Sequence, residues 1–137
     1  MGNQFEPRFD IGFHHMKLRE ITGADANSDT VQKPHGVTLN DPSGEPIAGA
    51  WAYSYYGIFV IEVMWVSPAH QRSGAGSELF AHLEEVARQR NCDVMVGSCL
   101  SFHESVGFWE KIGGEHYAEL KVPNRDYKIQ YLCKRPK

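Results

Sequence analysis

Apolar and polar residues alternate most clearly in the first half of the chain, where the pattern predicts three strands. The longest apolar run, residues 58–66, is rich in Ile, Val, Phe and Trp, which favours a buried strand. Two shorter runs at 37–40 and 47–56 flank the stretch Asp41-Pro-Ser-Gly-Glu-Pro46, whose Pro and Gly positions are typical of a turn. These two runs are therefore expected to pair as a hairpin.

The pattern is weaker before this hairpin. Residues 1–12 show no periodicity and are expected to form a loose arm. A strand is predicted over 13–21, where apolar residues partly alternate. The polar stretch 22–36 is rich in Gly, Asp and Asn, so it is interpreted as a loop with at most one short helical turn.

The second half of the chain alternates between helices and strands. Apolar residues recur every three or four positions between 74 and 91, which predicts a helix with one side against a core. The elements expected after it are a strand at 93–98, a helix at 104–112 and strands at 115–120 and 127–133. Because no repeat or linker interrupts this order, residues 13–137 are predicted to form one α/β domain.

Composition places the chain among soluble globular proteins. It has 137 residues, of which 42% are hydrophobic and 23% charged, so a disordered or fibrous protein is excluded. No apolar stretch approaches the ~18 residues of a membrane span, and the three cysteines include no Cys-x-x-Cys pair. Reduced thiols and a cytoplasmic location are therefore expected.

Charge is distributed unevenly along the chain. Residues 121–137 carry a balance of +5 and residues 1–120 a balance of −8. An acidic body disfavours broad contact with a nucleic-acid backbone, so nucleic-acid binding is unlikely. The basic tail is interpreted as a solvated terminus.

The segment 66–77 holds the most informative pattern, because a strand there runs through a short loop into a helix opened by Gly74 and Gly76. The first turn of a helix leaves N–H groups unpaired, and glycine lets an anion approach them, which suits a diphosphate. Arg72 adds a positive charge, and Ser73 and Ser77 add hydroxyls. A helix entry with permissive glycines is the alternative. The spacing matches neither a P-loop nor a Gly-x-Gly-x-x-Gly fingerprint.

This segment resembles motif A of the GNAT family, the Gcn5-related N-acetyltransferases. The residues that match in register are Val66, Pro68, Gln71, Gly74 and Gly76. The stretch Phe108-Trp-Glu-Lys-Ile-Gly-Gly114 is similar to a second segment of that family, and the resemblance covers roughly residues 47–133. It implies a GNAT-like α/β fold, with a central mixed, mainly antiparallel sheet and helices on both faces.

The resemblance also implies acetyl-CoA as the acetyl donor. Its pyrophosphate would be held by backbone N–H groups at the residues Gln71, Arg72, Ser73, Gly74, Ala75 and Gly76. Its pantetheine arm would lie along the strand that ends at Val66, where that strand and the next one splay apart, as an added strand does. A backbone N–H near Trp65 or Val66 would stabilise the oxyanion, and Phe108 and Trp109 would lie by the cofactor. Packing of Trp109 in the core is an equal alternative.

Acetyl transfer to an amine needs a base, because an amine like that of lysine is protonated at neutral pH. Glu62 is the one acid in the apolar run 58–66, so it is the candidate base. Strict alternation would place it on the same face as Val60, Met64 and Val66. The alternative is a solvent-facing carboxylate or one that pairs with a cation.

The departing thiolate needs a proton. Many family members use a tyrosine at the position of Trp109, and an indole N–H cannot replace it. Tyr56, His103 and Tyr117 are candidate substitutes, and a dedicated acid need not exist because the pKa of a thiol is only ~8.5.

The predicted function is therefore transfer of an acetyl group from acetyl-CoA to a primary amine by direct attack in a ternary complex. The alternative is a non-catalytic acyl-CoA-binding or protein-interaction module with the same fold. The acceptor is a small molecule or a protein, since the fold serves both. The family usually covers its acceptor site with the region that is short here, at 22–36. A short cover leaves an open cleft that admits a macromolecule or requires a dimer partner, and a homodimer is an open possibility.

Overall fold

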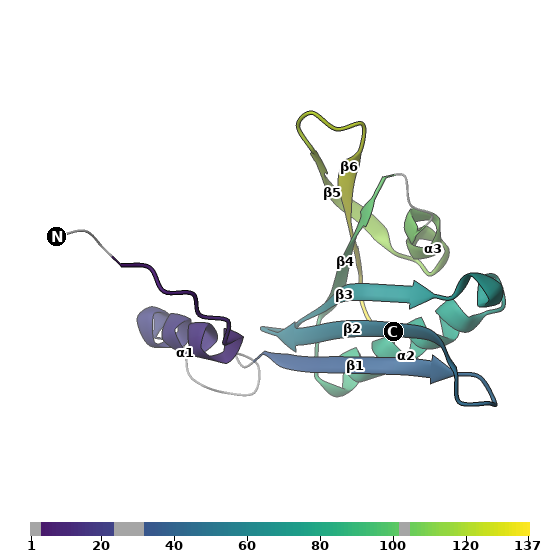
Figure 1. Ribbon diagram of the computed structural model, residues 1–137, viewed down its shortest axis with the longest axis horizontal. Coiled ribbons are helices and arrows are strands. Elements are labelled where there is room, and N and C mark those ends of the chain that lie inside the picture. Colours follow the sequence, from purple (N-terminus) through teal and green to yellow (C-terminus); the bar gives the residue numbers. More distant parts are fainter. Residues whose placement is uncertain (1–3, 24–31, 102–104) are drawn as a thin grey trace.

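The computed structural model describes residues 4–23, 32–101 and 105–137 (Figure 1). Within them it forms three α-helices, one short 3-10 helix and one sheet of six strands in the order β1-β2-β3-β4-β6-β5. The elements are α1 Ile11–Thr22, β1 Lys33–Asn40, β2 Pro46–Tyr55, β3 Ile58–Val66, η1 Pro68–His70, α2 Ala75–Gln89, β4 Val94–Leu100, α3 Ser105–Lys111, β5 Glu115–Lys121 and β6 Lys128–Lys134. All neighbouring strands are antiparallel except β3 and β4, which confirms the predicted mixed, mainly antiparallel α/β fold.

The hairpin turn forms for the reason that the sequence suggested. The Asp41 carboxylate accepts hydrogen bonds from the backbone N–H groups of Ser43 (2.9 Å) and Glu45 (3.0 Å). Gly44 adopts a left-handed φ of 91°, which other residues adopt only under strain. The turn therefore joins β1 and β2 in the expected place.

The N-terminal segment is the main error of the prediction, because residues 11–22 form a helix rather than a strand. Asp10 caps its start by accepting a hydrogen bond from the Phe13 N–H (3.3 Å), and Gly23 ends it with a left-handed φ of 71°. The strand β1 also begins at Lys33, four residues earlier than predicted. Most of the predicted loop, residues 24–31, lies outside the described residues.

The core lies between the sheet and α2. The buried residues of α2 lie on the predicted stripe; they are Ala75, Leu79, Phe80, Leu83, Val86 and Ala87. The helix α3 packs on the same face of the sheet, since its Trp109 ring contacts Phe80 at 5.6 Å between centroids and lies over Gly97 of β4. A Cβ at Gly97 would come within 2.6 Å of that ring, so the close packing of α3 depends on this glycine.

The opposite face of the sheet, here called the outer face, differs from the expectation of helices on both faces. On β2 the outer face carries Trp51, Tyr53 and Tyr55, which alternate with the core residues of that strand. The helix α1 lies beyond the ends of β1 and β2 and buries none of its residues (Figure 1). Among the described residues, α2 and α3 therefore cover one face and no helix covers the other.

The sheet opens between β3 and β4. These two strands pair only from Ile58 to Val60 against Val94 to Val96, although β3 continues to Val66. Beyond this point β4 pairs with β6 and turns away with β5 and β6, so that the sheet forms a V (Figure 1). The predicted splaying of these two strands is confirmed.

The C-terminal end is anchored to α2 by a buried ion pair. Lys134 Nζ donates a hydrogen bond to the Glu84 carboxylate, and the two side chains are only 7% and 12% exposed. The backbone N–H of Lys137 donates to the same carboxylate at 3.2 Å. Burial alone raises the pKa of the Glu84 carboxyl, but these hydrogen bonds outweigh it and hold the pKa below its usual value.

We expect Glu84→Ala to lower the free energy of unfolding at pH 7 by about 3 kcal/mol, because it leaves the buried Lys134 ammonium unpaired. A carboxyl with a depressed folded pKa stabilises the fold above its unfolded pKa, and this contribution is lost as the pH falls through the folded pKa. The difference from the wild type should therefore shrink in acid, as urea denaturation at pH 7 and at about pH 3 would measure. Glu85→Ala is the control, since Glu85 pairs with Arg88 in solvent and its loss should change little. An equal effect of both substitutions would contradict this account.

Candidate functional site

The loop between β3 and α2 is held in place by its own polar side chains. Gln71 Nε2 donates to the carbonyl oxygen of Val66 at 3.2 Å, and Ser73 Oγ donates to the carbonyl of His70. Ser67 Oγ lies 3.0 Å from His70 Nδ1. Two of the predicted cofactor-binding residues, Gln71 and Ser73, therefore use their side chains to fix the loop, which leaves their backbone N–H groups to bind a ligand.

The start of α2 presents unpaired amides to solvent. The first helical hydrogen bond runs from the Glu78 N–H to the carbonyl of Gly74 at 3.0 Å, so the N–H groups of residues 75–77 have no partner within the helix. Gly74 has a φ of 90°, and a Cβ there would meet nothing within 4 Å. This open space above free amides fits a diphosphate group, which the positive end of the helix also favours.

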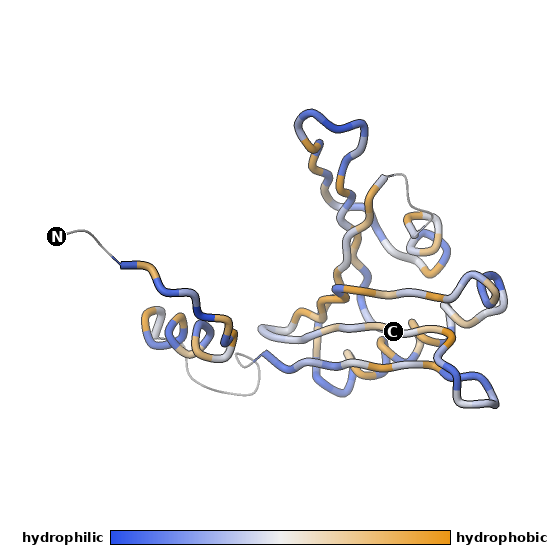
Figure 2. The backbone as a smooth tube through the Cα atoms, in the orientation of Figure 1, coloured by the Kyte–Doolittle hydropathy of each residue, from blue (hydrophilic) through white to orange (hydrophobic). Residues whose placement is uncertain are grey.

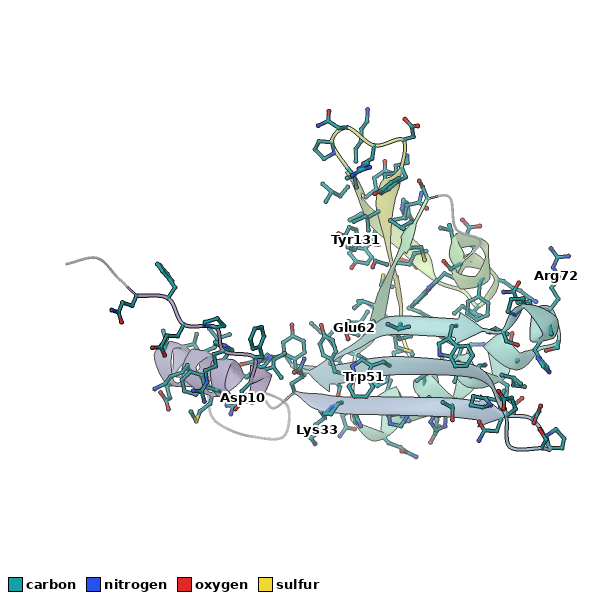
Figure 3. The ribbon with its side chains drawn as sticks, viewed as in Figure 1. Asp10, Lys33, Trp51, Glu62, Arg72 and Tyr131 are labelled. Carbon is teal, nitrogen blue, oxygen red and sulfur yellow. The ribbon has the colours of Figure 1, made fainter. Side chains whose placement is uncertain are left out.

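Two further residues of this segment have different roles. Gly76 lies close to the rest of the fold, since a Cβ there would be 3.4 Å from the Phe108 ring and 3.7 Å from Val66. Arg72 has a left-handed φ of 64° and an exposed side chain that points away from the body (Figure 3). Its guanidinium is free to reach the phosphate end of a ligand, whereas Gly76 lets α3 approach the loop.

The opening of the V leaves one edge of β3 without a strand. From residue 61 onward β3 pairs with β2 on one side only, because β4 has turned away. A strand edge of this kind offers alternating N–H and C=O groups to an extended ligand. It leads directly to the loop at residues 67–74, so an extended molecule on this edge would bring its end to the amides of α2.

Glu62 is the extra residue of a β-bulge. Trp51 of β2 lies opposite Val63 and the next residue, Ala52, lies opposite Ile61, so Glu62 has no partner of its own. The bulge shifts the alternation by one residue, and Met64 packs against the core as Ile61 does. The prediction that Glu62 shares a face with Met64 and Val66 is therefore wrong.

The carboxylate of Glu62 faces the outer face of the sheet. Tyr53 lies opposite Val60 on the same face, and burial, together with the nearby Tyr55 and the Glu62 carboxylate, raises the pKa of its hydroxyl. Tyr131 of β6 lies on the same face, because Tyr131 pairs with Ser98 and Val60 pairs with Val96. Figure 3 shows Glu62 and Tyr131 on the two arms of the V. Sequence reasoning missed Tyr131, since no local pattern reveals which β6 residue lies beside β4.

The other residues predicted to lie by the cofactor differ in their exposure. Trp65 is 41% exposed and lies over Gly49 of β2 on the outer face. Val66 and Phe108 are half-buried and pack against the core beside the loop. Trp109 is only 6% exposed, so the structure places it in the core, which was the alternative left open for this residue.

Two of the candidate proton donors, Tyr56 and Tyr117, lie among the described residues, and their ring contacts are with other tyrosines and not with Glu62. Tyr56 has a left-handed φ of 53° in the turn before β3, at the opposite end of this strand from residues 67–76. Tyr117 is exposed on β5, where its ring packs against Tyr131 at 6.2 Å. His103 lies outside the described residues.

Neither a cluster of potential metal ligands nor a membrane-spanning helix occurs in the described part of the chain. Its His, Cys, Asp and Glu residues form no group of three or more that could hold a metal ion. None of its helices has the length and hydropathy needed to cross a membrane.

Solved structures share the fold over two thirds of the chain or more. An acetyltransferase from Bacillus cereus ATCC 14579 matches with a TM-score of 0.76 at 18% identity, over 97% of both chains. The ribosomal-protein-S18-alanine N-acetyltransferase from Escherichia coli matches with a TM-score of 0.68 at 13% identity, over 87% of this chain and 76% of that chain. A protein described as a streptothricin acetyltransferase from Bacillus anthracis str. Ames, in complex with acetyl coenzyme A, matches at 0.63 and 17%, over 67% and 57%.

Sequence comparison gives the family directly. No curated protein matches the chain in sequence. The model of the acetyltransferase (GNAT) family matches residues 5–114, which include the loop, the bulged strand and both packed helices. The chain therefore belongs to the GNAT family of acetyltransferases.

Proposed function

We propose that the protein transfers an acetyl group from acetyl-CoA to a primary amine by direct attack in a ternary complex. One observation carries this proposal: the unpaired edge of β3 leads into free amides at Gly74, where a Cβ would meet nothing within 4 Å. That arrangement suits a ligand with an extended arm and a diphosphate at its far end. The family to which the chain belongs supports the same reading.

Several residues would hold acetyl-CoA, which when bound supplies a thioester whose carbonyl carbon is open to attack. The N–H groups of residues 71–76 and the Ser77 hydroxyl would bind the pyrophosphate, and the exposed Arg72 would add charge. The edge of β3 would pair with the amides of the pantetheine arm. A backbone N–H near Trp65 or Val66 would donate to the oxyanion that forms on the attacked carbonyl.

Glu62 would remove the proton from the amine. An amine with a pKa of ~10.4 is almost fully protonated at neutral pH and cannot attack until it loses that proton. Glu62 follows the buried Ile61 and is exposed on the outer face, two residues beyond the last β3 residue paired with β4, where an amine would approach. Tyr53 and Tyr131 lie on the same face by register, so their hydroxyls would orient the amine or a water that relays the proton.

The acceptor is proposed at the level of its reacting group. One structural neighbour is described as acetylating an alanine of a ribosomal protein and another as acetylating streptothricin. A primary amine on either a small molecule or a protein therefore remains within the proposal.

A non-catalytic module that binds acyl-CoA is the second candidate. Trp109 favours it, because this buried indole stands where many family members carry a tyrosine that donates a proton. The two candidates share the cofactor cleft and differ only in the chemistry at Glu62. Experiments on the cleft and on Glu62 therefore separate them.

We expect Gly74→Glu to weaken binding of CoA by at least about tenfold, because the added carboxylate would occupy the space above the amides of α2 and repel phosphate. Isothermal titration calorimetry with CoA measures this change. Gly44→Glu is a matched control, since Gly44 has a φ of 91°, equally open surroundings and a position in the β1–β2 turn. Both variants carry similar backbone strain, so equal losses of affinity would contradict the proposed site.

We expect Glu62→Gln to lower kcat for amine acetylation by about 10²–10⁴-fold at neutral pH while the affinity for CoA stays unchanged. The loss should shrink at alkaline pH, because a larger fraction of the amine is then already deprotonated. Release of CoA in the presence of a panel of amines measures both effects, with the exposed Glu45→Gln as the control of equal charge.

Two results would count against parts of this mechanism. An undiminished kcat in Glu62→Gln would remove Glu62 from the reaction. Tight binding of acetyl-CoA, with no release of CoA in the presence of any amine tested, would favour the non-catalytic module.

A further inference from the structure

Two tryptophans, Trp51 of β2 and Trp65 of β3, lie side by side on the outer face of the sheet. Together with Val63 they line a hollow of about 430 Å³, and these three side chains are 41% to 54% exposed. A volume of this size is in the range of small-molecule sites. The surface formed by these three residues is called the tryptophan floor below, and Figure 2 shows the apolar positions along β2 and β3.

Two glycines allow the indole rings to lie against the sheet. A Cβ at Gly36 of β1 would lie 2.8 Å from the Trp51 ring, and a Cβ at Gly49 of β2 would lie 2.7 Å from the Trp65 ring. Each indole therefore occupies the space over a glycine of the neighbouring strand, and a larger residue there would displace it. Glycine within a strand often marks a place where a ligand approaches closely. The rings are thus held in place without being buried, which suits the binding of a flat molecule.

The outer face of β1, β2 and β3, which are described in full, carries no positive charge. The residues of these strands that are Lys, Arg, His, Asp or Glu are Lys33, His35 and Glu62. Lys33 and His35 lie on the helix side of the sheet, because their partners in the register, Ser54 and Ala52, are buried there. Glu62 is therefore the one charged side chain that these three strands place on the outer face.

The strands β4, β5 and β6 have a similar distribution of charge. Lys128 and Lys134 each lie three residues from the outer-face residue Tyr131, so alternation places both lysines on the helix side. Glu115 pairs with Cys133, two residues from Tyr131, and therefore lies on the outer face. The other charged residues of β5 pair with β6 residues of the opposite parity. The outer face of the described strands thus carries carboxylates among aromatic and apolar groups, and such a surface attracts a cation and repels an anion.

We propose that the acceptor is an arylalkylamine: a primary amine joined by a short chain to an aromatic ring, with no anionic group. This inference rests on the proposed acetyl transfer and adds its substrate class. The ammonium would pair with Glu62, and the ring would lie on the tryptophan floor, since indoles stack with aromatic rings and attract cations. In the reaction the amine nitrogen bonds to the acetyl carbon and the carbon–sulfur bond of the thioester breaks. The ammonium loses one proton to Glu62 and one to the thiolate or water.

The distance from Glu62 to the tryptophan floor limits the length of the linker. Glu62 is the extra residue of the bulge opposite Trp51, and Val63 follows it directly. Figure 3 shows Glu62 and Trp51 on the neighbouring strands β3 and β2. Neighbouring strands lie about 4.8 Å apart, and the three residues from Glu62 to Trp65 span about 10 Å. A linker of about two or three carbon atoms would therefore bring the ring of an amine bound at Glu62 onto the nearer indole.

Four amines test the ring and the charge separately. Phenethylamine has both the amine and the ring, propylamine lacks the ring, phenylalanine adds a carboxylate to phenethylamine, and spermidine replaces the ring by further positive charges. Release of CoA from acetyl-CoA should give a kcat/KM for phenethylamine at least about tenfold above that for each of the other three. An equal or higher kcat/KM for any of the three would overturn the proposal.

Substitutions locate the surface that binds the ring. Trp51→Leu should lower kcat/KM for phenethylamine by at least about tenfold and leave that for propylamine nearly unchanged, whereas Trp51→Phe keeps a ring and should retain most of the activity. Trp51 is 47% exposed, so neither substitution opens a cavity in the core. Phe9→Leu is the control, because it removes an exposed aromatic ring outside the sheet. Equal losses for both amines in Trp51→Leu would overturn the proposal, since they would indicate a structural role.

A binding measurement separates failure of this proposal from failure of the proposed function. In isothermal titration calorimetry with CoA present, phenethylamine should bind the wild type at least about tenfold more tightly than Trp51→Leu. Such binding without acetylation would support the ligand class and count against acetyl transfer. Acetylation of other amines without binding of phenethylamine would overturn the ligand class and leave acetyl transfer intact. Neither binding nor acetylation would overturn both.

Discussion

The strand β3 pairs with β2 along its whole length but with β4 over only three residues. The shape of the candidate site depends on this difference in pairing. To stay paired with both β2 and β4, the strand β3 would have to keep a twist that suits both neighbours. The bulge at Glu62 prevents this, since one unpaired residue bends the strand and increases its twist locally. The sheet then opens beyond Val60, and the unpaired edge of β3 points toward the first turn of α2.

The same bulge determines which side chains face the chemistry. Alternation from the buried Phe59 and Ile61 already directs Glu62 to the outer face. The bulge leaves Glu62 and Val63 both exposed, so that Met64 returns to the core side as Ile61 does. A charged residue in the middle of an apolar strand is thus accommodated at little cost, because its burial is avoided rather than compensated.

The elements that are predicted correctly are those whose sequence pattern reflects contacts between residues close together in the chain. The stripe in α2, the Asp41 turn and the boundaries of β3 are found as expected, since each depends on contacts within a few residues. The placement of Met64 and Val66 on the face of Glu62 is wrong, because a bulge depends on the register with β2, which alternation in one strand cannot reveal. The helix α1 was missed because Met16, Leu18 and Ile21 partly alternate, although Asp10 is a residue that favours the start of a helix. Tyr131 was out of reach because it meets the site only through the pairing of β4 with β6.

The burial of Trp109 changes what the proposed acetyl transfer would require of other groups. Its indole fills the space over Gly97 and touches Phe80, so this position contributes packing between α3 and the sheet and no proton. The group that leaves a thioester is a thiolate, whose conjugate acid has a pKa of ~8.5. At pH 7 the absence of a donor therefore costs about 1.5 pKa units, or about 2 kcal/mol, which is small beside the barrier that the attacking amine must overcome. The protonated amine lies more than three pKa units on the unfavourable side of neutrality, which makes removal of its proton the larger demand. A fold that keeps a carboxylate at the bulge and spends its aromatic residue on packing is consistent with this order of importance.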